Sequence, residues 1–315
     1  MRAVMIVNPA SASGATARRW PEIARRAAAH GLDVEARLTE APGHAADLTR
    51  QALRDGAELI VAVGGDGTVS ETVNGFYDGA EAVAPTAELA VVSRGSGGDF
   101  ARNFRIPKAT DAALEVAAHG ALRTVDLGRV TYATRAGGTE SRLYCNVASA
   151  GLTGTVADRI NRSGKPLGAT VAFAWGAVVT FFGYRNSRFR VRIDERDVDQ
   201  VCNNVIVGNC RYFASGMKIL PMAEPDDGLL DVLVWGDVGK VDLALNLHRL
   251  YRGTHVNHPK ADFSRATRVV VEPETALPIE ADGEQPGVTP ATFEVVPAAV
   301  RLRVPPSVRS GSAAG

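Results

Sequence analysis

The chain has 315 residues, and its 35 lysines and arginines balance its 35 aspartates and glutamates, so the formal net charge at pH 7 is zero. This balance excludes a nucleic-acid-binding protein that depends on an overall basic charge, because such a protein needs an excess of Lys and Arg. The chain is 45% hydrophobic, which predicts a globular rather than a disordered protein, and its length favours two domains.

The first third of the chain alternates short apolar runs with amphipathic stretches. Residues 4–7, 32–38, 59–63 and 89–92 are predicted strands, and stretches between them, such as 15–30 and 45–54, are predicted helices. This order predicts an α/β domain with a parallel sheet and helices on both faces. Because ligands in such folds bind at the carboxyl ends of the strands, the loops there are the candidate site.

From about residue 125 the pattern changes to closely spaced apolar runs, which are typical of antiparallel strands. These runs cover residues 143–147, 189–193, 201–207, 229–235, 268–271 and 293–296. We therefore predict an α/β domain over residues 1–124 and a largely antiparallel β domain over residues 125–304. The tail, residues 305–315, is rich in Pro, Ser, Gly and Ala and is predicted to be disordered.

The segment Leu167–Tyr184 contains no charged residue over 18 positions, which is the lower limit for a membrane span. Gly and Thr dilute its apolar character, so a buried or cleft-lining helix is the preferred interpretation and contact with lipid without spanning is the alternative. No acidic residue occurs from Arg159 to Arg192, whereas basic residues stand on both sides of the segment. This charge pattern predicts that the region faces an anionic membrane surface.

A glycine-rich loop, Gly64-Gly65-Asp66-Gly67-Thr68, follows the third predicted strand and precedes a predicted helix. Glycines at such a turn let the backbone approach a ligand, and the N–H groups at the helix start bind phosphate oxygens. A carboxylate in this position would repel phosphate unless a divalent cation or a hydroxyl lay between them. Asp66 therefore indicates a Mg²⁺-nucleotide site or a proton acceptor, and the alternative is a tight turn in which Asp66 caps a helix.

Two further loops, Asn8–Gly14 and Ser93–Phe100, have the same position after predicted strands and are also rich in Gly and hydroxyl side chains. Three such loops at one edge of a sheet are hard to explain as ordinary turns. The sequence contains neither G-x-x-x-x-G-K-[ST] nor G-x-G-x-x-G, which disfavours P-loop NTPases and dinucleotide oxidoreductases.

Two acidic turns mark the second domain. In Glu224-Pro225-Asp226-Asp227-Gly228-Leu229 the carboxylates could coordinate a hard cation, and an ordinary Asp-Gly turn is an equal alternative. The turn Glu280-Ala281-Asp282-Gly283-Glu284 is typical of a solvated hairpin. If the turn lies beside a phosphate site, it becomes a candidate for the base. His255 and His258 are more consistent with a surface loop than with a metal site.

Taken together, the motifs resemble the diacylglycerol kinase catalytic family, the soluble bacterial lipid kinases related to sphingosine and ceramide kinases. The resemblance rests on an ordered set of segments: Asn8–Gly14, Gly64–Thr68 with Asn74-Gly75, Gly95–Arg102, Asp126–Gly128, Asn146–Gly151, Gly208-Asn209, Pro221–Val232 and Asp282–Glu284. It implies an α/β nucleotide-binding domain followed by a β-sandwich, with the active site in the cleft between them. The third motif has Gly98 where the family usually has Asn, which puts an amide contact there in doubt.

The resemblance also implies roles for individual residues. Glu284 would accept the proton of the lipid hydroxyl, and Asp66 and Asp282 would be partners in a catalytic Mg²⁺ and water network. A structural Mg²⁺ would be held by Asp227 with the carbonyl groups of Glu224 and Leu229. The residues implied to bind ATP are Asn8, Ser11, Ala12, Ser13, Gly14, Thr39, Gly64, Gly65, Asp66, Gly67, Thr68, Val69, Ser70 and Ser96.

The implied activity is ATP- and Mg²⁺-dependent phosphorylation of a neutral lipid, with diacylglycerol as the favoured acceptor and phosphatidic acid as the product. The expected enzyme is cytoplasmic and peripheral at the inner membrane surface, and a homodimer is left open. One alternative is a phosphotransferase similar to NAD kinases, which share G-G-D-G-T but normally carry an Asn-Glu pair that this sequence lacks. The other is a catalytically silent lipid-binding or regulatory protein on the same fold.

Overall fold

The computed structural model describes residues 1–95, 97–162 and 183–306, which form two compact units. The first unit comprises Met1–Asp126 together with the chain from Pro297 onward, and the second comprises Leu127–Val296. The last strand, β16 (Val288–Val304), crosses the boundary between the units, so that only its end, from Pro297 onward, belongs to the first unit. Ser96, residues 167–182 of the uncharged segment and residues 307–315 of the tail lie outside the described residues.

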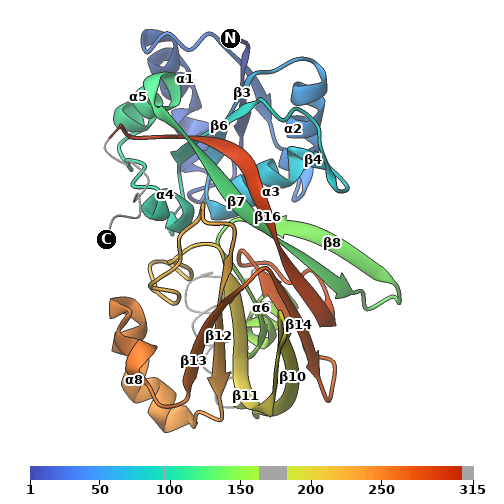
Figure 1. Cartoon of the computed structure of the whole chain (residues 1–315). Helices are drawn as coiled ribbons and strands as arrows, with labels where there is room; N and C mark the ends of the chain where they lie inside the picture. Colours follow the sequence, from blue (N-terminus) through green and yellow to red (C-terminus); the bar gives the residue numbers. More distant parts are fainter. Residues whose placement is uncertain (96, 163–182, 307–315) are drawn as a thin grey trace, which may run out of the picture. The chain divides into compact units, whose positions relative to one another are not determined.

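The first unit contains a parallel sheet, as predicted (Figure 1), and its strands lie in the order β2-β1-β3-β6. Its strands are β1 (Ala3–Val7), β2 (Val34–Leu38), β3 (Leu59–Gly64) and β6 (Glu88–Ser93). The end of β16 (Val288–Val304) adds a further parallel strand beside β6, where Arg301 lies opposite Glu88. Because β1 and β3 are buried along their whole length, their sequences are continuous apolar runs.

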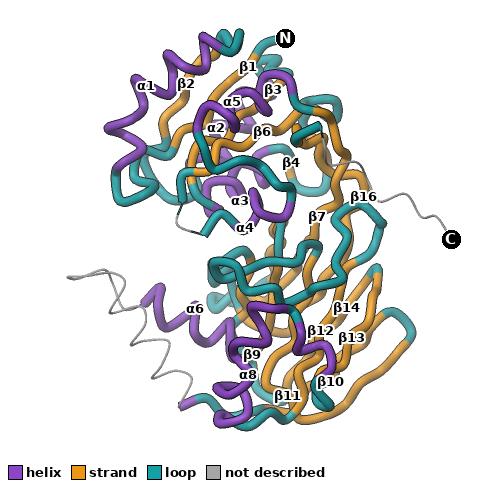
Figure 2. Tube along the Cα trace, turned by 90° about the vertical axis from the view of Figure 1, so that its left-hand side faces the viewer, coloured by secondary structure: helices purple, strands orange, loops and turns teal. Residues whose placement is uncertain are grey.

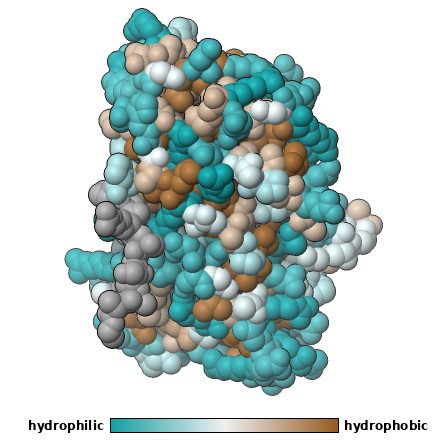
Figure 3. Space-filling model, turned by 45° about the horizontal axis from the view of Figure 1, so that its top comes forward, coloured by the Kyte–Doolittle hydropathy of each residue, from teal (hydrophilic) through white to brown (hydrophobic). Residues whose placement is uncertain are grey.

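Helices cover both faces of this sheet (Figure 1). On one face α1 (Ala15–Ala29) and α5 (Thr110–His119) bury Ile23, Ala27 and Leu114 against the strands. On the other face lie α2 (His44–Arg54) and α3 (Asp66–Gly75). The short helix α4 (Asp99–Asn103) follows β6, and a small hairpin joins β4 (Tyr77–Asp78) to β5 (Glu81–Ala82). The face of the molecule that Figure 3 shows is mainly hydrophilic, with separate hydrophobic patches.

The second unit is built from antiparallel strands, as predicted, in the order β13-β12-β11-β10-β14-β16, and β9 pairs with both β11 and β15. The strands are β7 (Ala121–Ala133), β8 (Thr139–Tyr144), β9 (Val147–Gly151), β10 (Ser187–Ile193), β11 (Arg196–Gly208), β12 (Leu230–Gly236), β13 (Ala261–Ala266), β14 (Arg268–Pro273) and β15 (Ile279–Ala281). Tyr144, Phe189 and Phe293 are fully buried in its core.

Two helices, α6 (Leu152–Arg162) and α8 (Lys240–Arg252), lie on the same side of these strands, and the 3₁₀ helix Thr254–Asn257 follows α8 (Figure 2). Both helices border one cavity, which is described below. Among the described residues, no helix has the length and apolar character that a membrane crossing requires.

Two sequence expectations differ from the structure. The run 143–147 is not one strand, because β8 ends at Tyr144 and β9 begins at Val147. His255 and His258 are buried instead of lying in a surface loop. The His255 ring stacks on Trp235 with 5.4 Å between ring centroids, and its Nε2 lies 2.8 Å from the carbonyl oxygen of Ile219. Burial lowers the pKa of His255, which is consistent with a neutral ring packed in the core.

Candidate functional site

The predicted nucleotide loops of the first unit meet at the carboxyl edge of its parallel sheet. The backbone N–H of Asn8 donates to the carbonyl oxygen of Val63 at 3.0 Å, and its side-chain Nδ2 donates to Thr68 Oγ1 at 3.0 Å. The N–H of Thr39, just after β2, donates to the carbonyl oxygen of Val7 at 2.9 Å. The loops after β1, β2 and β3 are therefore held together by hydrogen bonds, as the strand order requires.

Asp66 is the first residue of α3, and its carboxylate connects the loop after β3 to the loop after β6. Oδ2 accepts a hydrogen bond from the N–H of Gly98 at 2.7 Å, and Oδ1 accepts one from the N–H of Phe100 at 3.0 Å. These N–H groups belong to the start of α4, where backbone donors have no partner within the helix. Asp66 thus caps a helix, but that helix is its neighbour and not its own.

Glycines let the loops after β3 and β6 touch. A Cβ atom on Gly95 would lie 2.8 Å from the Cα atom of Gly65, and the N–H of Arg94 donates to the carbonyl oxygen of Gly64 at 2.6 Å. Gly98 has a φ of 65°, a left-handed conformation that Gly adopts freely and that Asn tolerates better than most residues. The backbone at position 98 therefore suits both this chain's Gly and the Asn that is usual in the family which the sequence resembles.

The loop before α1 offers backbone donors to an anion. Ala12, Ser13 and Gly14 have positive φ values of 52°, 55° and 78° in succession. Among the hydrogen bonds of the described residues, the N–H groups of Ala12 and Ser13 donate to no acceptor. Arg18 lies next to Gly14, and the first turn of α1 has no acidic residue. Free N–H groups, a helix N-terminus and a nearby guanidinium fit a phosphate group.

The remaining predicted ATP residues are placed differently. Val69 and Ser70 are buried within α3, with 2% and 3% of their surface exposed, so their side chains face the interior of the unit. They can contribute to a nucleotide site only through their backbone. The hydroxyl of Ser11 is engaged inside its own loop, 2.6 Å from Thr16 Oγ1. Ser96 lies outside the described residues.

In the second unit the turn Asp282-Gly283-Glu284 follows β15. The Asp282 carboxylate accepts hydrogen bonds from the N–H groups of Cys145 at 2.7 Å and Asn146 at 2.9 Å, which is why the run 143–147 is interrupted. Glu284 is partly exposed, and its Oε2 forms an ion pair with Arg142 Nη1 at 2.9 Å. The turn therefore presents one carboxylate bound to backbone and one bound to a guanidinium.

Glu280, two residues before this turn, is a site residue that sequence reasoning missed. It is 5% exposed, and its carboxylate accepts hydrogen bonds from the N–H of Gly283 at 2.5 Å and from Ser149 Oγ at 2.9 Å. Burial raises the pKa of Glu280 to about 7. The interpretation as a solvated hairpin is therefore wrong for Glu280. Its place in β15, a strand buried at all three positions, is the signal that could have identified it.

An apolar cavity of about 360 Å³ lies in the second unit, bordered by α6, α8 and the strands β11 and β12. The strands contribute Ile206 and Trp235, and the helices contribute apolar side chains. Polar side chains are few, and Thr153 and Asn204 are two of them. The apolar wall from the helices comprises Leu152, Val156, Leu243, Ala244, Leu247 and Leu250. An apolar cavity with few polar groups is typical of a site for a hydrophobic ligand.

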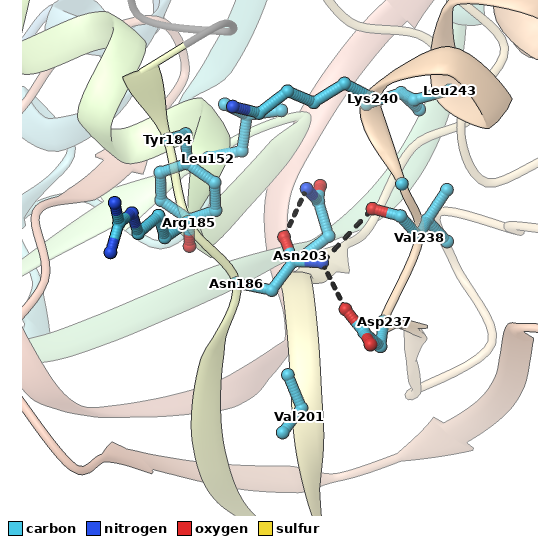
Figure 4. A pocket seen from close by; sticks show the side chains of 11 residues that line it. Leu152, Tyr184, Arg185, Asn186, Val201, Asn203, Asp237, Val238, Lys240 and Leu243 are labelled. Atoms are coloured by element: carbon cyan, nitrogen blue, oxygen red, sulfur yellow. Dashed lines mark hydrogen bonds between the residues drawn. The ribbon is translucent and has the colours of Figure 1, made fainter.

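A second, more polar cavity adjoins it at the start of α8 (Figure 4). Asn186 Nδ2 donates to Asp237 Oδ1 at 2.7 Å and to the carbonyl oxygen of Val238 at 3.1 Å, and Asn203 Nδ2 donates to Asn186 Oδ1 at 3.0 Å. The Lys240 side chain extends across this cavity toward Leu152 (Figure 4). These bonds connect the residue before β10 with β11 and with the loop before α8, and so they fix the start of that helix.

The predicted metal turn does not favour a resident metal ion. Oδ1 of Asp227 accepts a hydrogen bond from the N–H of Leu229 at 3.1 Å, and its Oδ2 forms an ion pair with Arg265, which supplies the positive charge that a cation would supply. The Glu224 side chain pairs with Arg211. No group of three or more His, Cys, Asp or Glu residues suited to a metal occurs in the part of the chain that the structure describes. The structural Mg²⁺ stays a prediction.

Two family models match consecutive parts of the chain. The family model for the diacylglycerol kinase catalytic domain matches residues 2–130, and the model for the YegS C-terminal NAD kinase beta sandwich-like domain matches residues 146–304. A diacylglycerol kinase of Staphylococcus carnosus is 25% identical over 309 residues, which cover 98% of this chain and 97% of that protein.

Solved structures show the same fold. A structure described as a diacylglycerol kinase from Bacillus anthracis is 20% identical, with a TM-score of 0.72 and 98% of each chain covered. Yeast NADH kinase, solved with NADH, is a more distant fold relative: the identity is 10% and the TM-score 0.53, with 96% of this chain and 82% of that chain covered.

Proposed function

Because the chain belongs to the diacylglycerol kinase catalytic family, with the YegS-type C-terminal domain, we propose that it transfers the γ-phosphoryl group of ATP to the hydroxyl of a neutral lipid. Diacylglycerol is the proposed acceptor and phosphatidic acid the product. The observation that carries the lipid assignment is the apolar cavity of about 360 Å³, which lies in the same unit as the acidic turn at Asp282–Glu284.

The first unit would bind the nucleotide. Phosphoryl transfer asks the protein mainly to position the phosphates and to neutralise their charge. The free N–H groups of Ala12 and Ser13, the N-terminus of α1 and the side chain of Arg18 supply both at the edge of the parallel sheet. The contact between Gly65 and Gly95 keeps the neighbouring loops close without side chains that would occupy the phosphate site.

Asp66 and Asp282 fit a role beside Mg²⁺·ATP. Each of their carboxylate oxygens accepts a backbone N–H bond, and a carboxylate oxygen with two lone pairs can also bind a cation or a water bound to it. When bound, Mg²⁺ would neutralise charge that develops on the phosphates. We assign the proton transfer to Glu284, because it is the more exposed carboxylate of its turn and its pairing with Arg142 fixes its orientation.

We further propose that the enzyme contacts an anionic membrane surface through α8. Val241, Leu245 and Tyr251 are 74%, 70% and 50% exposed, an unusual concentration of apolar surface on one helix. Arg249 and Arg252, on the same helix, form no ion pair within the described residues. An amphipathic helix with apolar and cationic side chains toward solvent is typical of interfacial binding.

The basic region predicted for this role carries less free charge than its sequence suggests. Arg188 forms an ion pair with Asp199 at 2.7 Å, and Arg192 forms one with Asp197 at 2.8 Å. The double variant Arg249→Glu/Arg252→Glu should therefore weaken binding to phosphatidylglycerol-containing vesicles more than Arg185→Glu/Arg188→Glu does. Flotation at two salt concentrations measures this, because the electrostatic part of the binding weakens as salt rises. Equal binding of both variants and the parent would contradict the α8 assignment.

The activity itself is tested with the full chain, Mg·ATP carrying a labelled γ-phosphate and dioctanoylglycerol in mixed micelles. We expect labelled phosphatidic acid, separated by thin-layer chromatography. Parallel reactions with ceramide, a sphingoid base and NAD identify another acceptor if there is one. Phosphorylation of NAD alone would favour an NAD kinase-like activity. Lipid binding without transfer to any acceptor would favour a catalytically silent protein.

A further inference from the structure

Four polar side chains form a continuous hydrogen-bonded series through the interior of the second unit. Asn204 Nδ2 donates to Thr153 Oγ1 at 2.8 Å, and the hydroxyl oxygens of Thr153 and Ser149 are 2.5 Å apart. Ser149 Oγ donates to Glu280 Oε2 at 2.9 Å. We call Asn204, Thr153, Ser149 and Glu280 the polar chain.

The two ends of the polar chain lie at functionally different places. At one end Asn204 and Thr153 are in the wall of the apolar cavity. At the other end Glu280 Oε1 accepts the hydrogen bond of the Gly283 N–H at 2.5 Å, in the middle of the turn that carries Asp282 and Glu284. The polar chain thus runs from the proposed lipid site to the proposed catalytic turn.

The polar groups of the polar chain are buried, and a buried polar group destabilises the fold unless it forms a hydrogen bond within the protein. Ser149 is completely buried, and Glu280 and Asn204 are 5% and 4% exposed, so each polar group needs a partner inside the protein. An ionised Glu280 can only accept hydrogen bonds, so Ser149 must donate to it, Thr153 to Ser149, and Asn204 to Thr153. All hydroxyl protons then point in one direction, from the cavity wall toward the turn.

We propose, on the basis of the function proposed above, that Glu280 is a positioning residue, which holds the Asp282–Gly283–Glu284 turn in place. Glu280 is in turn held by the other members of the polar chain, Ser149, Thr153 and Asn204, which extend to the wall of the lipid cavity. The turn has no regular secondary structure of its own, and Asp282 adopts a left-handed φ of 49°. The Glu280 carboxyl group supplies the Gly283 N–H with an acceptor, and this hydrogen bond is stronger when the carboxyl group is ionised. Misplacing Glu284 by a fraction of an ångström would slow phosphoryl transfer without removing any group that touches a substrate.

The test uses the full chain and dioctanoylglycerol with Mg·ATP. Ser149→Ala cuts the polar chain at its centre and should lower kcat about tenfold, since it removes one hydrogen bond to a charged group, while KM for ATP stays unchanged. Thr153→Val keeps the shape and leaves Ser149 in place, and it should lower kcat about threefold. The matched control is Thr155→Val on the same helix, whose hydroxyl donates only locally to the carbonyl oxygen of Gly151 at 2.9 Å. It should leave kcat unchanged.

Replacements of Glu280 separate positioning from simple stability. Glu280→Gln can accept from Gly283 N–H and donate to Ser149, so it should retain kcat within about threefold, whereas Glu280→Leu should lose at least tenfold. The double variant Ser149→Ala/Glu280→Leu should have a kcat no lower than that of Glu280→Leu alone, because both changes interrupt the same polar chain. Wild-type kcat in Ser149→Ala and Thr153→Val, or multiplicative effects in the double variant, would overturn the proposal.

Two further measurements do not depend on turnover. Hydrogen exchange of the peptide that contains Gly283 should be faster in Ser149→Ala and Thr153→Val than in Thr155→Val, and equal exchange in all three would overturn the positioning role. Trp235 lines the cavity, so quenching of its fluorescence by a brominated diacylglycerol reports lipid binding, which should persist in Ser149→Ala. If the wild-type protein transfers no phosphate, the proposed function fails, and hydrogen exchange still decides the positioning role.

Discussion

The carboxylates of Asp66 in the first unit and Asp282 in the second unit are hydrogen-bonded in the same way but lie in different surroundings. Each carboxylate accepts two backbone N–H groups from a loop distant in sequence, Gly98 and Phe100 in one case and Cys145 and Asn146 in the other. The other groups near Asp66 are glycine backbones and helix ends. The other groups near Asp282 are the ionisable side chains of Arg142, Glu280 and Glu284. The phosphate oxygens of a nucleotide can accept hydrogen bonds from backbone N–H groups. A carboxylate that accepts a proton needs nearby charged groups that fix its orientation.

The largest effect is expected from removing either carboxylate. Asp66→Ala and Asp282→Ala should each reduce phosphoryl transfer more than a hundredfold and lower the free energy of unfolding by about 1–3 kcal/mol, because two backbone donors lose their acceptor. Kinase assays and denaturant titrations measure the two quantities. If Asp66→Ala kept wild-type activity, its loop would have no part in the reaction. If Asp282→Ala alone kept activity, the two carboxylates would not be equivalent.

The glycines beside the two carboxylates should respond differently to Ala. In Gly95→Ala the new Cβ would lie 2.8 Å from the Gly65 Cα atom, so the loops must separate and ATP affinity should fall by about tenfold or more. Gly283 has a φ of 89° and open space around it, so Gly283→Ala should add backbone strain of about 1–2 kcal/mol and leave ATP affinity unchanged. Calorimetric titration with ATP distinguishes the variants, and equal affinities would contradict the close approach of the two loops.

The side-chain surroundings of Asp282 should make stability depend on pH. Burial raises the pKa of Glu280 to about 7 in the folded protein, above the 4.5 of an exposed Glu. The folded state therefore holds a proton that the unfolded state releases, and the free energy of unfolding should fall by up to ~3 kcal/mol between about pH 4.5 and pH 7. Glu280→Gln should flatten this slope in urea titrations at several pH values. A slope unchanged by the substitution would assign the effect to other groups.

The smallest effect is expected at a third acidic turn, where Asp227 accepts one backbone N–H, from Leu229, and its other carboxylate oxygen pairs with the guanidinium of Arg265. Adding MgCl₂ without ATP should shift the thermal midpoint of the wild-type protein by less than about 1 °C, because the carboxylate is already neutralised. In Arg265→Gln the carboxylate becomes available, and a larger Mg²⁺-dependent shift should appear. Choline chloride at equal ionic strength is the control. A strong Mg²⁺ shift in the wild-type protein would support the predicted structural metal.

The sequence was sufficient to predict the parallel sheet, because continuous apolar runs such as Leu59–Val63 are required wherever a strand is covered on both faces. It also predicted that the loops at Asn8 and Asp66 lie at one edge, since strand order and direction dictate this. The partners of Asp66 could not be predicted, because Gly98 and Phe100 contribute backbone N–H groups, which leave no side-chain signature.

Other features were missed because sequence patterns do not reveal the environment of a charge. Glu280 carries the same charge as Glu284, but one is buried and the other partly exposed, and their spacing alone does not separate them. The exposed apolar side chains of α8 also break the usual rule that such residues face the core, so its helical period was not recognised. These departures from simple patterning are located at the proposed lipid-binding unit.

The return of β16 to the first unit has a consequence for how the protein is made. Tyr77 Oη donates to the carbonyl oxygen of Ala299 at 3.0 Å, and Arg303 pairs with Glu88 at 2.7 Å, so residues near the C-terminus complete the sheet that carries the glycine loops. The ribosome releases these residues after the other strands of that sheet. The edge of β6 must therefore stay open, and prone to pairing with other chains, until β16 has been released.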